Sequence, residues 1–295
     1  MNRIGKQYLA HTVDDRGKAE SGLYAMPSQS CVIVDEPSWA INLKKRFPSI
    51  LVIHRTTLPN ENDKKLHDLM SPAKFIEDNR VFANTNVLVQ VYNEPETYRT
   101  FQPAVNFCAA LYDENLRQKA GLRFCFLNVG MGHIAEYAAP MLDPLLYRVA
   151  GYVQGSVIGV HEYAERSTKL ERPDRIGRFE LITNRCRQLG LPPVQLAVTE
   201  FGRDSGGGYD DGYQSHMTSE QYVQFIWEAM DAYAPFNIPI NIFCYGHGYH
   251  RWDKFNIEHD DVVNAGIDRY GKLVPVQALW RVAPRWWRLA PASRH

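Results

Sequence analysis

Short apolar runs alternate with longer amphipathic segments along this 295-residue chain, and this alternation constrains the fold more than any other feature. The runs are rich in β-branched residues, as expected of strands that are buried on both faces. Seven runs are clear: 30–35, 50–55, 87–95, 122–130, 156–163, 194–202 and 239–246. A weaker run at Gln7–Thr12 makes eight, the number of strands that closes an α/β barrel.

Between the runs, the spacing of apolar residues predicts helices, and strict alternation of strands and helices is typical of a parallel sheet. The predicted helices are 19–25, 38–47, 73–82, 101–120, 137–153, 176–189, 219–233 and 262–282, with Ser219 as an N-cap. The competing doubly wound sheet requires a glycine-rich phosphate turn, which no strand-to-helix turn here carries. We therefore predict a single-domain (β/α)8 TIM barrel over 1–295, with 273–295 as a basic, aromatic tail or cap.

The charge balance argues against strongly charged partners. Lysine plus arginine and aspartate plus glutamate both number 33, so the formal net charge is zero. The chain has no basic surface of the kind that binds nucleic acid or an anionic membrane. A neutral substrate fits better, and an aromatic content of 12% is compatible with a cleft in which rings stack on sugars.

The start of the chain and its cysteines bear on the compartment. The first ten residues lack the apolar core of a signal peptide, and no stretch reaches 18 apolar residues. Five widely spaced cysteines lie within apolar runs: Cys31, Cys108, Cys125, Cys186 and Cys244. Such positions predict buried thiols in a reducing compartment. We expect a cytoplasmic protein, or a secreted one if a leader peptide has been removed.

Two of the predicted strands deliver a glutamate to their C-terminal ends. The run 87–95 ends in Asn93-Glu94-Pro95, and the run 194–202 carries Glu200. The two are 200 − 94 = 106 residues apart. A barrel of about 250 residues has roughly 30 to 35 residues per unit, so three units separate them along one rim. Two carboxyls that face each other across a cleft are what hydrolysis of a glycosidic bond requires.

Further polar side chains fall at strand ends, and aromatic side chains fall in the loops between them. The polar set is Asp35, Glu36, His54, Arg55, Asn93, His133, His161, Tyr163, Tyr245 and His247. The aromatic set, which could stack on sugar rings, is Trp39, Tyr98, Tyr249 and Trp252. So many polar ends on otherwise apolar strands exceed what a stable fold needs, and together they predict a functional rim.

On these residues the sequence resembles the clan A glycoside hydrolases, which are retaining (β/α)8 enzymes. The resemblance rests on Asn93-Glu94-Pro95, on Thr199-Glu200-Phe201-Gly202, and on His161-x-Tyr163 between them. It implies that Glu94 is the general acid and base, on the fourth strand, and that Glu200 is the nucleophile, on the seventh. Both a family-five-like barrel and a compact endo-β-1,3-glucanase-like barrel are compatible with it, and no cofactor or metal is expected.

The resemblance also implies supporting roles. Asn93 would hydrogen-bond the sugar 2-hydroxyl, while Arg55 and Tyr163 would stabilise the charge of the nucleophile. His161 would orient a carboxyl or bind a sugar hydroxyl, and His133 would support or bind the substrate.

One departure from the clan pattern concerns the eighth strand. Many members end it with a tryptophan that forms the floor of the sugar site, whereas this chain has Phe243-Cys244-Tyr245-Gly246. Tyr245 or Trp252 would have to take that role.

The sequence thus predicts a retaining hydrolase of β-glycosidic bonds in a polysaccharide or oligosaccharide, endo-acting rather than exo-acting. Two alternatives stay open. A barrel could be kept as a non-catalytic carbohydrate-binding module, although both glutamates are present. A metal-dependent hydrolase could use rim histidines, although no strand carries a His-x-His pair. The candidate rim histidines are His54, His133, His161, His247 and His250.

Overall fold

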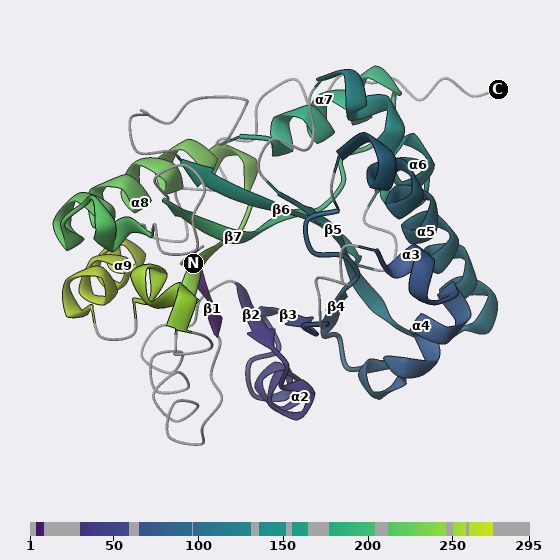
Figure 1. Cartoon of the computed structure of the whole chain (residues 1–295), viewed down its shortest axis with the longest axis horizontal. Helices are drawn as coiled ribbons and strands as arrows, with labels where there is room; N and C mark the ends of the chain where they lie inside the picture. The colour runs from purple at the N-terminus through teal and green to yellow at the C-terminus, as the bar shows by residue number, and fades with distance from the viewer. Residues whose placement is uncertain are drawn as a thin grey trace.

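Eight parallel strands close into a barrel in sequence order, which confirms the predicted fold. The computed structural model describes residues 4–8, 30–58, 65–95, 97–130, 136–151, 155–164, 177–203, 212–245, 250–257 and 260–273. The first strand closes the ring, because it pairs in parallel with both the second and the eighth. Figure 1 shows the strands in the middle of the molecule with helices around them.

Most strands begin and end within three residues of the ends of the predicted runs. They are β1 (Ile4–Tyr8), β2 (Ser30–Val34), β3 (Leu51–Arg55), β4 (Leu88–Gln90), β5 (Arg123–Val129), β6 (Val157–Ala164), β7 (Leu196–Arg203) and β8 (Ile240–Tyr245). The largest difference is β4, which has only 3 residues because the chain leaves the ladder before Asn93 and Glu94. Glu94 therefore lies just past the fourth strand, and Glu200 lies within the seventh.

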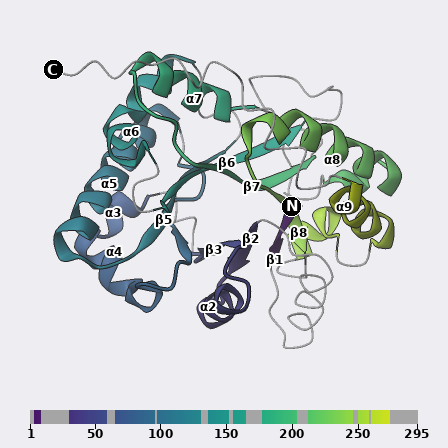
Figure 2. The same ribbon diagram turned by 180° about the vertical axis from the view of Figure 1, so that it is seen from behind.

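The helices surround the barrel, with α8 and α9 on one side and α3 to α6 on the other, as the two opposite views agree (Figure 2). The α-helices are α2 (Pro37–Arg46), α3 (Leu66–Leu69), α4 (Pro72–Asp78), α5 (Thr97–Gln118), α6 (Asp143–Val149), α7 (Phe179–Gln188), α8 (Ser219–Tyr233) and α9 (Asp261–Leu273). The 3-10 helices are η2 (Arg80–Phe82), η3 (Glu136–Leu142), η5 (Tyr213–Ser215), η6 (Ala234–Phe236) and η7 (His250–Phe255). None of the described helices is long and apolar enough to cross a membrane.

Three predicted helices differ in detail. The segment 137–153 divides into η3 and α6, because Pro140 and Pro144 supply no backbone N–H and disfavour a continuous helix. The segment 73–82 divides into α4 and η2 at Asn79. Thr218, not Ser219, caps α8: its backbone N–H donates to Gln221 Oε1 at 2.9 Å, and its hydroxyl accepts from the Gln221 N–H at 3.3 Å, which is a capping box.

Two apolar layers hold the barrel together. A small cluster takes one residue from each of six successive strands, which places it inside the barrel: Val32, Ile53, Leu88, Cys125, Val157 and Ala197. A much larger cluster lies between the strands and the helices. Since side chains alternate along a strand, Arg55, Gly159 and Thr199 also face the interior, two residues beyond members of the inner layer. The inner layer thus fixes which rim residues can meet.

All five cysteines are buried and unpaired, as the sequence predicted. The predicted helix at 19–25 and the basic, aromatic tail lie outside the described residues, apart from Leu273 at the end of α9.

Candidate active site

The Glu200 carboxylate is held between a cation and a hydroxyl. Arg55 Nη1 lies 2.5 Å from Glu200 Oε1, and the Tyr163 hydroxyl donates to Glu200 Oε2 at 2.8 Å. Arg55 comes from the end of β3 and Tyr163 from β6, so three strands converge on one carboxyl group. Charge-assisted bonds of this kind stabilise the ionised carboxylate. Burial, and to a smaller extent the neighbouring carboxylates, raise the pKa of Tyr163 well above its usual range. The hydroxyl therefore stays protonated and can donate a hydrogen bond to Glu200.

Glu94 has a different environment from Glu200. Its side chain is 31% exposed, against 9% for Glu200, and its Oε1 lies 2.9 Å from His161 Nδ1. The other ring nitrogen of His161 is buried and has no hydrogen-bond partner among the described residues. An ionised carboxylate only accepts hydrogen bonds, so we assign a proton to His161 Nδ1, which donates to Glu94 Oε1.

The backbone around Glu94 is tightly constrained. Glu94 has a φ of 50°, which is unusual for a residue other than glycine. Its N–H donates to the Asn128 carbonyl at 3.0 Å, which fixes this conformation. Gly130 packs against the Glu94 side chain: a Cβ at position 130 would lie 2.8 Å from the Glu94 carboxyl carbon. The site therefore needs a glycine there.

The two carboxyl groups are close together. One oxygen of Glu94, one oxygen of Glu200 and a ring nitrogen of His161 all lie within 4.8 Å of one another. His161 Nδ1 is 3.4 Å from Glu200 Oε2, so this histidine lies between the two acids. Retaining glycosidases have carboxyl groups about 5 to 5.5 Å apart, and inverting ones about 6.5 to 9.5 Å. One oxygen of each carboxyl group lies within 4.8 Å of the other, a spacing below the inverting range.

The same three residues are the one group in the described part of the chain close enough to ligate a metal ion. Both Glu200 oxygens are already engaged, one by the Arg55 cation and the other by the Tyr163 hydroxyl. A metal at this point would have to compete with Arg55 for the same carboxylate. The Arg55 cation beside Glu200 therefore disfavours a second cation at this point.

Among the other predicted rim histidines, His54 has a described side chain, and it does not join this cluster. His54 lies outside the barrel, where its ring contacts Phe82 with centroids 4.7 Å apart, so its expected place on the rim was wrong. Because the neighbouring Ile53 and Arg55 face inward, alternation turns His54 towards the helices. His133 and His247 lie outside the described residues, and His250 lies in η7 with a side chain that is not described.

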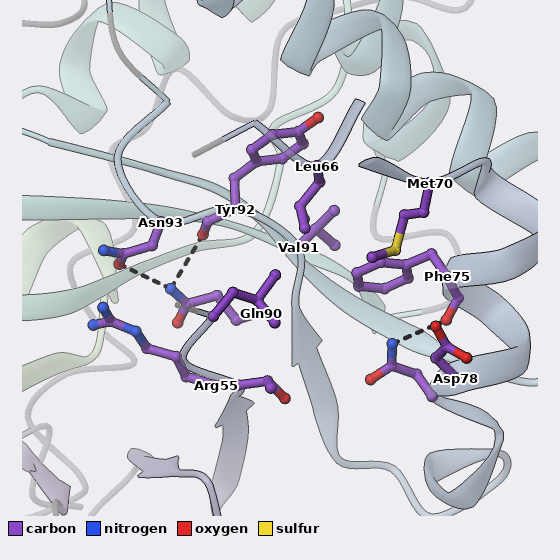
Figure 3. Close-up of a pocket in the computed structure, with 12 residues that line it drawn as sticks. Arg55, Leu66, Met70, Phe75, Asp78, Gln90, Val91, Tyr92 and Asn93 are labelled. Carbon is purple, nitrogen blue, oxygen red and sulfur yellow. Dashed lines mark hydrogen bonds between the residues drawn. The ribbon is translucent and has the colours of Figure 1, made fainter. Parts of the chain in front are cut away.

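Asn93 directly precedes Glu94 in the sequence and lines a pocket. Its amide oxygen accepts from Gln90 Nε2 at 3.2 Å. A pocket of about 160 Å³ extends from Arg55, Gln90 and Asn93 to an apolar end formed by Leu66, Met70 and Phe75 (Figure 3). The pocket is smaller than the roughly 300 Å³ at which ligand pockets begin, so it could hold only part of a substrate.

The aromatic predictions have mixed outcomes. Trp39 lies in the core and is 5% exposed, so its expected place in a rim loop was wrong: Pro37 starts α2 at once, and Trp39 faces inward from the first turn. Tyr245 ends β8 with Lys6 Nζ 4.8 Å from its ring centre, while Phe243 packs against Tyr163. Tyr98 lies in the first turn of α5 and Trp252 in η7, and neither side chain is described; Tyr249 lies outside the described residues.

Sequence reasoning missed Asn128, a fully buried amide inside the barrel. It contacts both the strand that leads to Glu94 and the strand that carries Glu200. The available signal was a lone amide within the apolar run Phe124–Val129.

Comparison with known proteins places the fold but not the family. No family model matches the chain, and no curated protein matches it. Among solved structures, the Clostridial cellulose synthase subunit Z from Clostridioides difficile is 9% identical, with a TM-score of 0.54 over 90% of this chain and 99% of that one. The GH39 enzyme from Xanthomonas axonopodis pv. citri is 11% identical, with a TM-score of 0.58 over 92% and 66%.

A GH39 β-xylosidase from Caulobacter crescentus is 10% identical to the chain, with a TM-score of 0.56 over 91% of this chain and 70% of that one. At such low identities these likenesses show a shared barrel fold. Fold and site together define a (β/α)8 barrel with two carboxylates of unequal environment facing each other at its C-terminal rim.

Proposed function

We propose that this protein is a retaining glycoside hydrolase that cleaves β-glycosidic bonds, with Glu200 as the nucleophile and Glu94 as the acid and base. The observation that carries the proposal is the pairing of two carboxyls within 4.8 Å, one bound to a cation and the other to a histidine. Double displacement requires this division, since one carboxylate must stay ionised while the other carries a proton.

In the first step, an oxygen of Glu200 attacks the anomeric carbon while the bond to the leaving oxygen breaks and Glu94 gives its proton to that oxygen. The Tyr163 hydroxyl and the Arg55 guanidinium would stabilise the negative charge of the Glu200 carboxylate until it bonds to carbon. The His161 Nδ1–H donates to Glu94 Oε1, which leaves the proton of the acid for Oε2.

In the second step, Glu94 takes a proton from water, and the water oxygen displaces Glu200 from the anomeric carbon. Two inversions at one carbon leave the product with the configuration of the substrate. Asn93, which precedes the acid in the sequence and lines the pocket, would bind the 2-hydroxyl of the same sugar.

For the substrate we propose a β-linked polysaccharide or oligosaccharide, cleaved internally. The β-xylosidase among the similar structures agrees with a carbohydrate substrate. Internal cleavage would release a spread of oligosaccharides from the start of the reaction, whereas cleavage from an end would release one small product throughout.

A rescue experiment tests the assignment of the nucleophile. In Glu200→Ala, turnover of an aryl β-glycoside should be abolished, and azide should restore it by entering the vacated space and attacking the same face. Because only one displacement then occurs, the product should be the α-glycosyl azide.

The matched control is Glu77→Ala, which removes an exposed glutamate from α4 and should leave turnover unchanged. If folded Glu200→Ala kept wild-type activity, the assignment would be wrong. If the wild type bound sugars without hydrolysing any β-glycoside, and Glu94→Gln left that binding unaltered, a carbohydrate-binding barrel would replace the proposal.

A further inference from the structure

Asn128 occupies an unusual position at the end of β5. The register with β6 shifts between Phe126 and Val129, and both Leu127 and Asn128 have positive φ, at 70° and 45°. Cys125 belongs to the inner layer, so regular alternation would turn Leu127 inward and Asn128 outward. The bulge reverses this and places the amide inside the barrel, where it is fully buried.

The Asn128 side chain connects the segment that leads to Glu94 with the strand that carries Glu200. Its Nδ2 donates to the Tyr92 carbonyl at 2.8 Å, and its Oδ1 accepts from the Thr199 hydroxyl at 2.8 Å. Its own carbonyl accepts from the Glu94 N–H at 3.0 Å. One residue therefore holds the backbone on which Glu94 sits and the residue directly before Glu200.

The surrounding strands are shaped to admit this amide. A Cβ at Gly159, on the inward face of β6, would lie 2.1 Å from Asn128 Oδ1, so no other residue fits there without moving the amide. The register between β6 and β7 shifts at Thr199, between the pairs Val160–Val198 and His161–Glu200. Because of that shift, Thr199 reaches Asn128 while the next residue, Glu200, also faces the site.

We infer that Asn128 is a positioning residue that sets the separation of the two catalytic carboxyls through Thr199 on one side and the Glu94 backbone on the other. The inference rests on the proposed function, because separation matters only if both carboxyls react at one sugar carbon. Asn128 is fully buried, so it would act on the carboxyl groups through Thr199 and the Glu94 backbone and not by touching the substrate. Misplacing reactive groups by about 1 Å can cost roughly 100-fold in rate, and carboxyl separation distinguishes retention from inversion.

A matched pair of variants tests the inference. Thr199→Val keeps the shape of the side chain and removes the donor to Asn128, whereas Thr199→Ser keeps the hydroxyl. We expect Thr199→Val to lower kcat for an activated aryl glycoside by about 10- to 100-fold with little change in KM. Thr199→Ser should keep a kcat close to that of the wild type. If Thr199 contributed only packing, the variant that keeps its shape, Thr199→Val, would not lose more activity than the variant that keeps its hydroxyl, Thr199→Ser.

Gly159→Ala provides an independent variant, since its added methyl group would displace Asn128 Oδ1, the atom that accepts from Thr199, while Thr199 itself stays unchanged. It should lower kcat as well. Thermal unfolding of each variant shows whether it is folded, and if Thr199→Val does not fold, Gly159→Ala decides the question.

Crystal structures of the wild type and the variants separate the two proposals. The separation of the Glu94 and Glu200 carboxyls should change in Thr199→Val and Gly159→Ala and stay at the wild-type value in Thr199→Ser, whether or not any glycoside is hydrolysed. Unchanged separation with unchanged kcat would overturn the role of Asn128. A wild type without hydrolysis would instead overturn the proposed function, while the measured separations would still decide whether Asn128 controls the geometry.

Discussion

Replacing His54 should remove a large pH dependence from the stability of this protein. The His54 side chain lies in the core and is 2% exposed, and neither ring nitrogen has a hydrogen-bond partner in the part of the chain that the structure describes. Burial lowers its pKa from 6.5 to about 4, and the negative charge of Asp35 opposes this only in part. The folded protein therefore keeps His54 neutral under conditions in which the unfolded chain protonates it.

The size of the effect follows from the pKa difference. A pKa that falls from 6.5 in the unfolded chain to about 4 in the folded protein limits the contribution of His54 to roughly 3 kcal/mol. Because the folded pKa is the lower one, this stability is fully present above pH 6.5 and is lost as the pH falls towards 4. A loss of roughly 3 kcal/mol is a large part of the total for a typical protein.

Urea unfolding followed by tryptophan fluorescence between pH 4 and 8 measures the effect. His54→Leu and His54→Asn both lack a titrating ring, so the free energy of unfolding of each should fall less than that of the wild type, by up to roughly 3 kcal/mol. The two variants differ in polarity, so their common pH dependence isolates the titration. A constant difference between wild type and both variants across this range would refute the reasoning.

Three further predictions concern the site and its surroundings. Glu94→Ala should lose about 100- to 10,000-fold on substrates with poor leaving groups and far less on activated aryl glycosides, because only the former need protonation; equal losses on both would contradict its role as the acid. Tyr163→Phe removes a hydrogen bond to a charged carboxylate, worth about 1.5 to 3 kcal/mol, so kcat/KM should fall at least tenfold in a steady-state assay, and an unchanged value would exclude that contact from catalysis. Burial raises the pKa of Glu162 from 4.5 to about 7, with Gly177, Arg178 and the start of α7 opposing it. Since this folded pKa is raised, stability is full below pH 4.5 and lost as the pH rises through 7, so wild type should lose roughly 3 kcal/mol against Glu162→Gln in urea unfolding over that interval, and parallel curves would contradict it.

The barrel was predictable because its strands are buried on both faces and its helices on one. That difference in periodicity survives in the sequence, and it placed Glu94 and Glu200 three strands apart. Arg55 and Tyr163 were also predicted as partners of Glu200, and they contact it. Position at a strand end identified these four residues, although Glu200 faces the site only because of the register shift at Thr199.

The failures have a common cause, which is that a strand end does not reveal which face a side chain takes. His54 is next to Arg55 in the sequence and points the other way. Asn128 points inward only because of a bulge, and a bulge depends on contacts between distant strands, such as the space left by Gly159. These contacts form only when the barrel closes, so no local pattern predicts them.

The stereochemistry of the first product tests the central claim most directly. Proton NMR of an aryl β-glycoside during the first minutes of hydrolysis, before mutarotation, identifies the anomer that the enzyme releases. With the carboxyls within 4.8 Å, the account predicts the β-anomer first, followed by slow appearance of the α-anomer. Release of the α-anomer first would show a single displacement and would contradict the assignment of Glu200 as a nucleophile.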